Sequence, residues 1–354
     1  MYRLALYSSV LLVASATRIA AGDLVKIWEV RLSELPGSNI TSSAALVYSV
    51  SFSPDGRSLG VLVKGIESHS IFAVLGVDDP RRGVRAQGYD GPAADDVTGP
   101  ISWSLTGNEV AVPRIFHIFE QPWTGCALEH TGHAVFYDSD RVADVQRGFP
   151  ASTILSFDSN CNLLESWPIK GLWERFDGSA DNHLLALSNN IPKNTEVLVV
   201  DPLRKKLIRQ WPMADTNGTW PVFADRGRAV CANDGTGKHG AAHCWDVVGD
   251  REISKTTSRN FHGRIGAALD APRVVLSSYG WRFEFEGFYT AVGSLEERVV
   301  WDFRTGKEIA SWKARYQNPD HSQILEPYPV AISPDGTMVA EGGLGLLTLF
   351  KVRP

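Results

Sequence analysis

A short strand–turn–strand motif recurs through this chain of 354 residues and constrains its fold more than any other feature. Residues 51–62 read SFSPDGRSLGVL and residues 331–342 read AISPDGTMVAEG, so each copy has two strand-like segments separated by a tight polar turn. Degenerate copies between them are ISWSLTGNEVAV (101–112), RFDGSADNHLLAL (175–187), PVFADRGRAVCA (221–232) and AALDAPRVVLSS (267–278). This repetition predicts an all-β chain built from similar units.

A second strand–turn–strand element follows most copies. Its first strand ends in an apolar residue followed by Asp, and its second strand commonly ends in Trp. The copies are TILSFDSNCNLLESW (153–167), EVLVVDPLRKKLIRQW (196–211), AHCWDVVGDREI (242–253) and RVVWDFRTGKEIASW (298–312). Each complete unit therefore contains four short antiparallel strands, and four-stranded units repeated along a chain are the blades of a β-propeller.

The spacing of the turns predicts the number of blades. An ordinary blade needs ~40–45 residues, whereas 75 residues separate the turn positions Gly107 and Asn182. We interpret this gap as one blade with an insertion, which favours six blades, with seven as the alternative. The strand-like segment 24–33 has no turn partner nearby, and the last repeat ends one strand after its hairpin, at 348–352. We therefore expect the N-terminal strand to close the last blade.

The FSPDG turn and the pairs Trp245-Asp246 and Trp301-Asp302 resemble the WD-repeat β-propeller family. The resemblance covers about residues 24–354 and is closest to divergent, bacterial-type members. It implies a propeller architecture without specifying an activity. The Gly-His dipeptide that opens a typical WD repeat is missing, so the family's buried Asp-His-Ser/Thr-Trp hydrogen-bond network is not transferred to this sequence.

The first 21 residues have the pattern of a secretory signal peptide, which leaves 22–354 as a single propeller domain. Arg3 is followed by an apolar segment, 4–13, that is too short to span a bilayer, and small-residue cleavage sites precede Gly22. The sequence thus predicts a secreted or periplasmic protein without a transmembrane segment in the mature chain. The alternative is a buried N-terminal helix or strand.

The four cysteines allow three full pairings. Cys231 and Cys244 flank a Gly-rich turn centred between them, which predicts that they face each other on adjacent antiparallel strands, within disulfide range. Cys161, at a hairpin tip, and Cys126, in the insertion, are then left to pair. The alternative is four free thiols in a chain that stays in the cytoplasm.

Two apparent insertions are rich in aromatic residues. One spans about 113–150 and the other about 279–292, and both join the second and third strands of their blades, so both should emerge on one face of blades two and five. Exposed aromatic clusters mark binding surfaces, and the alternative is that longer strands pack on each other. The candidate binding residues are Trp281, Phe283, Phe285, Phe288, Tyr289, Phe116, Phe119 and Trp123.

A set of oxygen-bearing residues precedes the turns by about ten positions, where the innermost strands should begin at the mouth of the central channel. Similarity to six-bladed propeller hydrolases and lactonases implies a calcium ion there, held by oxygen ligands from several blades. The alternative is that these are ordinary polar residues at loop ends. The residues are Asp96, Glu174, Asn217, Asn260 and Glu326.

Charge and missing motifs narrow the function. The formal net charge is −5 and there is no basic block, which argues against a nucleic-acid partner. The sequence contains no G-x-S-x-G elbow, H-E-x-x-H motif, phosphate loop or EF-hand loop. We therefore expect a non-catalytic module without a cofactor that binds an unknown protein or glycan through its loop-rich face. The alternative is a metal-dependent hydrolase or lactonase-type enzyme with calcium in the channel.

Overall fold

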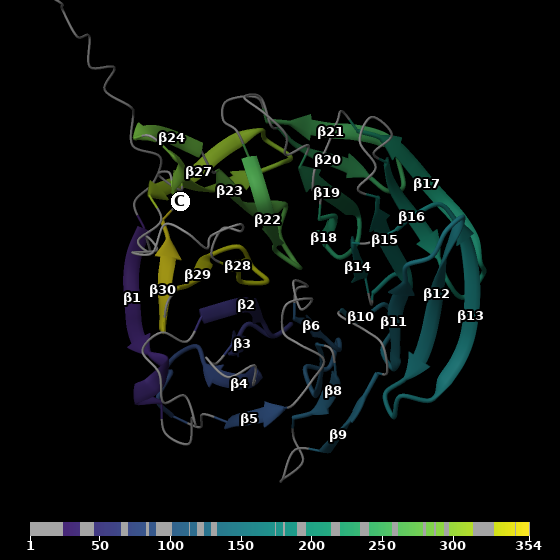
Figure 1. Cartoon of the computed structure of the whole chain (residues 1–354), viewed down its shortest axis with the longest axis horizontal. Helices are drawn as coiled ribbons and strands as arrows, with labels where there is room; N and C mark the ends of the chain where they lie inside the picture. Colours follow the sequence, from purple (N-terminus) through teal and green to yellow (C-terminus); the bar gives the residue numbers. More distant parts are fainter. Residues whose placement is uncertain are drawn as a thin grey trace, which may run out of the picture.

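In the part of the chain that the computed structural model describes, seven four-stranded antiparallel sheets form a closed ring (Figure 1). The molecule is therefore a seven-bladed β-propeller, and the expectation of six blades was wrong. The described residues are 24–35, 46–64, 70–82, 85–89, 101–112, 114–118, 124–128, 133–173, 175–179, 181–189, 196–213, 220–233, 241–256, 261–278, 281–286, 288–293, 297–313, 329–343 and 345–353.

Blades 1 to 4 follow one another along the chain, each beginning with its innermost strand. Blade 1 consists of β2 (Leu46–Phe52), β3 (Ser58–Lys64), β4 (Ser70–Gly76) and β5 (Arg85–Tyr89). Blade 2 consists of β6 (Ser102–Trp103), β7 (Glu109–Ala111), β8 (Arg114–His117) and β9 (Thr124–Ala127). Blade 3 consists of β10 (Val135–Phe136), β11 (Arg141–Gln146), β12 (Ala151–Asp158) and β13 (Leu163–Lys170). Blade 4 consists of β14 (Arg175–Ser179), β15 (Leu184–Ser188), β16 (Glu196–Asp201) and β17 (Lys206–Pro212).

Blades 5 and 6 continue this order, and blade 7 combines both ends of the described chain. Blade 5 consists of β18 (Val222–Ala224), β19 (Ala229–Asn233), β20 (Ala242–Asp246) and β21 (Arg251–Lys255). Blade 6 consists of β22 (Phe261–Ala267), β23 (Arg273–Ser278), β26 (Glu297–Asp302) and β27 (Lys307–Lys313), with β24 (Trp281–Glu286) and β25 (Phe288–Gly293) inserted. Blade 7 consists of β28 (Val330–Ile332), β29 (Met338–Gly342), β30 (Leu346–Val352) and β1 (Leu24–Arg31), which a 3-10 turn (Leu32–Glu34) follows.

The blade that the sequence did not predict lies in the 75-residue gap. Blades 2 and 3 both fit there because their innermost strands, β6 and β10, have only two residues each. The segment 113–150, expected to be an insertion, instead supplies β8 and β9 and the first two strands of blade 3. The hairpin of blade 3 turns through Tyr-Asp-Ser-Asp, which lacks the glycine found in the corresponding turns of blades 1, 2, 5 and 7.

The N-terminal strand closes the ring, as predicted. β1 pairs antiparallel with β30 from Leu24–Val352 to Arg31–Leu346, and the two strands lie side by side in Figure 1. Val30 and Leu32 are buried in the apolar cluster shared by blades 7 and 1. The closing strand therefore contributes both a backbone ladder and core side chains.

Similar side-chain hydrogen bonds recur in the turns of this chain and explain why these segments form hairpins. In the first turn of blades 1 and 7, Ser53 and Ser333 donate to Asp55 and Asp335, while the following glycines adopt left-handed φ angles near +71° and +72°. In the outer turns of blades 5 and 6, Asp246 and Asp302 accept backbone N–H groups two and three residues ahead. Each turn is thus held by its own side chain.

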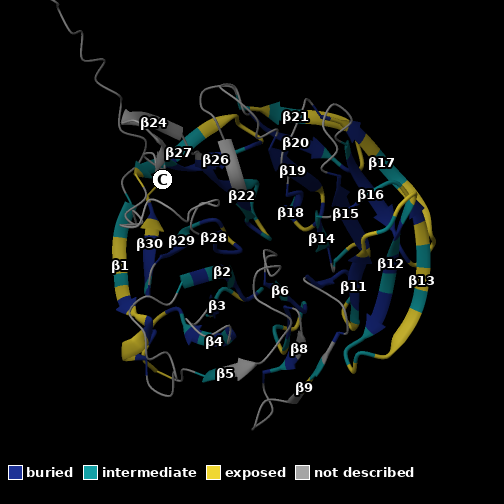
Figure 2. Ribbon diagram, in the orientation of Figure 1, coloured by how far each residue is buried: buried dark blue, intermediate teal, exposed yellow. Residues whose placement is uncertain are grey.

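Apolar side chains on both faces of the inner strands pack between neighbouring blades. The second strands β15 and β19 are buried along their whole length, whereas the outer strands β13 and β17 are largely exposed (Figure 2). Burial on both faces suits the continuous apolar runs of the inner strands. Surfaces available to a partner therefore lie on the outer strands and on the connections between strands.

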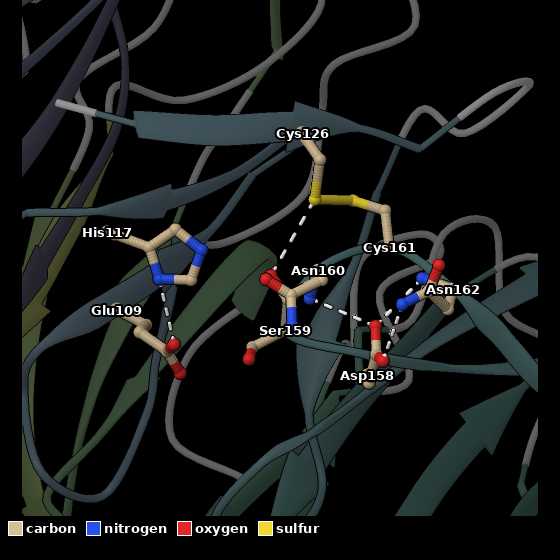
Figure 3. Close-up of a disulfide and its surroundings, with 8 residues drawn as sticks. All are labelled: Glu109, His117, Cys126, Asp158, Ser159, Asn160, Cys161 and Asn162. Atoms are coloured by element: carbon tan, nitrogen blue, oxygen red, sulfur yellow. Dashed lines mark hydrogen bonds and ion pairs between the residues drawn. A yellow bond between two sulfur atoms is a disulfide. The ribbon is translucent and has the colours of Figure 1, made fainter.

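Both predicted disulfides are present. Cys231 and Cys244 are directly opposed on β19 and β20, with Cα atoms 4.1 Å apart. Cys126 and Cys161, with Cα atoms 5.9 Å apart, were expected to lie in the same blade. They instead join β9 of blade 2 to the outer turn of blade 3 (Figure 3). This second bridge fastens the short-stranded blade 2 to its neighbour.

Candidate functional site

A two-stranded ribbon, β24–β25, stands apart from the four-stranded sheet of blade 6. It connects β23 to β26, the second and third strands of that blade, as expected for the aromatic segment. The ribbon belongs to blade 6 and not to blade five, because the additional blade in the 75-residue gap shifts the numbering by one. In Figure 1, β24 lies at the periphery of the ring near β27, the outermost strand of blade 6. The ribbon is the one addition to the four-stranded repeat among the described sheets.

The register of the ribbon places most of its aromatic residues on one face. In an antiparallel pair, directly opposed residues share a face and successive residues alternate between faces. The pairs Trp281–Gly293, Phe283–Ala291 and Phe285–Tyr289 therefore share one face, which we call the aromatic face. The other face holds Phe288, Thr290 and Val292 from β25 and Arg282, Glu284 and Glu286 from β24. Four of the five candidate aromatic residues of this segment therefore share one strand face, and Phe288 lies on the other.

The other expected aromatic site is not formed by Phe116. This residue is 2% exposed on β8, and its ring stacks on Phe72 with ring centroids 5.5 Å apart. Phe116 therefore belongs to the core between blades 1 and 2, and its selection as a binding residue was wrong. Phe119 and Trp123 lie outside the described residues.

The five residues expected at the channel mouth, Asp96, Glu174, Asn217, Asn260 and Glu326, all lie outside the described residues. Within the described ranges, no group of three or more His, Cys, Asp or Glu side chains is arranged to hold a metal ion. Of the residues near Cys126, His133 is described, and its Nε2 lies 2.9 Å from the carbonyl oxygen of Phe176. His133 is therefore buried in an interblade contact.

The inner strands enclose a cavity of about 210 Å³ at the centre of the ring. Its described walls are apolar residues, glycines and serines, and Asp177 is the one ionisable side chain among them. This volume is below the roughly 300–1,000 Å³ of most small-molecule sites.

Asp177 links two blades, a role that sequence reasoning missed. Its Oδ2 accepts the backbone N–H of Phe223 at 2.8 Å, which joins β14 of blade 4 to β18 of blade 5. Burial raises the pKa of this carboxyl to about 6, although the backbone hydrogen bonds oppose that shift. Ser102, at the equivalent repeat position, accepts the N–H of Phe136 at 2.9 Å. The signal in the sequence was an Asp where other repeats have Ser or an apolar residue.

A second buried carboxyl lies on β11. Asp144 is 5% exposed, and its register partner on β12 is Leu155. Val142 and Phe157 belong to the apolar cluster between blades 2 and 3, on the strand face that Asp144 also occupies. Burial raises the pKa of Asp144 to about 7, with a smaller opposing effect from the N–H of Val145.

Comparisons with known proteins do not assign this propeller to a family. No model of a known protein family matches the chain, and no curated protein matches it. In the described residues, no helix is both long enough and apolar enough to cross a bilayer. The class defined by the fold is therefore a seven-bladed β-propeller with one aromatic ribbon.

Proposed function

We propose that this chain is an exported, non-catalytic propeller of divergent WD-repeat type that binds a protein or glycan partner. The aromatic face of the β24–β25 ribbon is the binding surface. The single observation that supports this proposal is the register that aligns Trp281, Phe283, Phe285 and Tyr289 on one face of an added ribbon. Large aromatic side chains supply much of the binding energy at interfaces.

Two further observations agree with this proposal. The central cavity is small, and its described walls offer one carboxyl group without a nucleophile–base pair. Two disulfides suit an oxidising compartment, in which export would place the chain. The alternative, a hydrolase or lactonase with a channel cation, predicts stoichiometric calcium or zinc that survives dialysis, so metal analysis of the purified protein separates the two functions.

The experiment is affinity capture from the native source with the wild-type chain as bait, followed by mass spectrometry. Trp281→Ala combined with Phe285→Ala should abolish capture of the specific partner and leave the melting temperature nearly unchanged. Arg282→Ala combined with Glu284→Ala, on the opposite face of the same strand, is the matched control and should retain capture. A Trp281/Phe285 variant that is destabilised by several kcal/mol, as core truncations are, yet still captures the partner would overturn the proposal.

A further inference from the structure

The ribbon has two outer edges besides its two faces. β24 and β25 pair with each other, and neither has a second hydrogen-bonded neighbour among the described strands. An isolated two-stranded ribbon is marginally stable in water. An unpaired strand edge also presents a row of backbone donors and acceptors that another strand can use. A further strand would therefore stabilise this ribbon directly.

The two edges differ in how well they are protected. β24 reads WRFEFE and carries a charge at every second residue, whereas β25 reads FYTAVG and has neither a charge nor a proline. Edge charges and prolines are the usual devices that prevent strand addition. Since β25 has neither, its outer edge is the one open to pairing.

We propose that β25 pairs antiparallel with β25 of a second copy of this chain, so that two ribbons form one four-stranded sheet. A two-fold axis perpendicular to the sheet makes one edge complementary to itself, so no other partner is needed. Each chain has a formal net charge of −5, so a shared edge without charged residues avoids adding like-charge contacts to that repulsion. The six residues of β25 provide such a strip.

This arrangement has a consequence for the ribbon's faces. Rotation about an axis perpendicular to the sheet keeps the two aromatic faces on the same side. The dimer would thus double the aromatic face without changing any residue in it. The inference uses the edge of β25 and stands whether or not the aromatic face binds the proposed partner.

Light scattering after size-exclusion chromatography tests the proposal on the purified full chain over a concentration series. The expected mass is twice that of one chain, falling to one chain on dilution. Thr290→Lys combined with Val292→Lys brings four like charges together at the shared edge and should give one chain at every concentration. Thr290→Ser combined with Val292→Ile keeps the strand uncharged and should remain a dimer. A wild-type chain that is monomeric throughout, or a lysine variant that remains dimeric, would overturn the proposal.

Cysteine crosslinking provides a test that does not depend on disrupting the strand. The described cysteines are all in disulfides, so a new thiol reports on its own surroundings. Ala291→Cys, near the middle of β25, should form an interchain disulfide under mild oxidation. Glu284→Cys, on the other strand of the same ribbon, should not. Equal crosslinking by both variants, or none by Ala291→Cys, would contradict the pairing.

Discussion

Replacing Asp144 by Asn should make the protein more stable at neutral and alkaline pH but not in acid. The side chain is buried among apolar groups between blades 2 and 3, and its pKa rises from 3.8 in the unfolded chain to about 7 in the folded protein. Between these values the folded protein retains a proton that the unfolded chain has lost. The free energy of unfolding therefore falls as the pH rises through this range, and the loss is complete above the folded pKa.

The size of the effect follows from the shift. Each pKa unit is worth about 1.4 kcal/mol, so a rise of roughly three units costs up to about 4 kcal/mol above pH 7. Asn has nearly the same shape and remains neutral, so Asp144→Asn should recover this cost at pH 8. Below the unfolded pKa of 3.8, where both states hold the proton, the variant and the wild type should differ by a constant amount.

Urea unfolding at a series of pH values measures this difference, with the disulfides kept oxidised. The matched control is Asp158→Asn, because Asp158 is an exposed turn cap whose pKa is lowered by hydrogen bonds from Asn162. That control should lose stability at neutral pH and show no gain at pH 8. A stability difference between Asp144→Asn and the wild type that does not change from pH 4 to pH 8 would refute the reasoning.

Two further predictions concern blade 7. Arg298 of β26 and Glu341 of β29 form an ion pair, with Nε and Oε1 3.5 Å apart and neither side chain exposed, so Glu341→Gln should cost about 3–5 kcal/mol in urea unfolding. Arg298→Met combined with Glu341→Leu should recover most of that loss, and a double variant less stable than Glu341→Gln would contradict this explanation. Deleting residues 22–34 removes β1 and buried Val30 and Leu32, so light scattering should detect aggregation through the bare edge of β30. A monomeric truncation with unchanged melting temperature would show that β1 is dispensable.

The repeat and its closure were predictable because their signals are local. The recurring polar turns identified six hairpins, and the unpaired strand near the N-terminus predicted its partner at the other end. The pair Cys231–Cys244 followed from the symmetry of the intervening turn. The turns and this disulfide depend on chemistry within a few residues, and closure followed from counting the strands of the first and last repeats. The corresponding hairpins, closing strand and disulfide are present.

The missing blade and the misplaced Phe116 have one physical cause. A strand of two residues, such as Val135–Phe136, gives no alternating pattern, so its blade was interpreted as an insertion. Residues placed in an insertion are expected to be exposed, and Phe116 was therefore assigned to a surface although β8 is a core strand. Asp177 and Asp144 were missed because their burial depends on contacts between blades, which the chain's local pattern does not report.

The composite seventh blade also determines when the ring can close during biosynthesis. Thr348 and Glu29, whose side chains hydrogen-bond across the closing strands, are 319 residues apart in sequence. At roughly 5–20 residues per second, a ribosome needs on the order of 15–60 s to make the chain between them. Throughout that interval β1 has no partner, and blades 1 to 6 can form only an open arc. β30 follows the strands of blades 1 to 6 in the chain, so the ring stays unclosed until this strand has been synthesised.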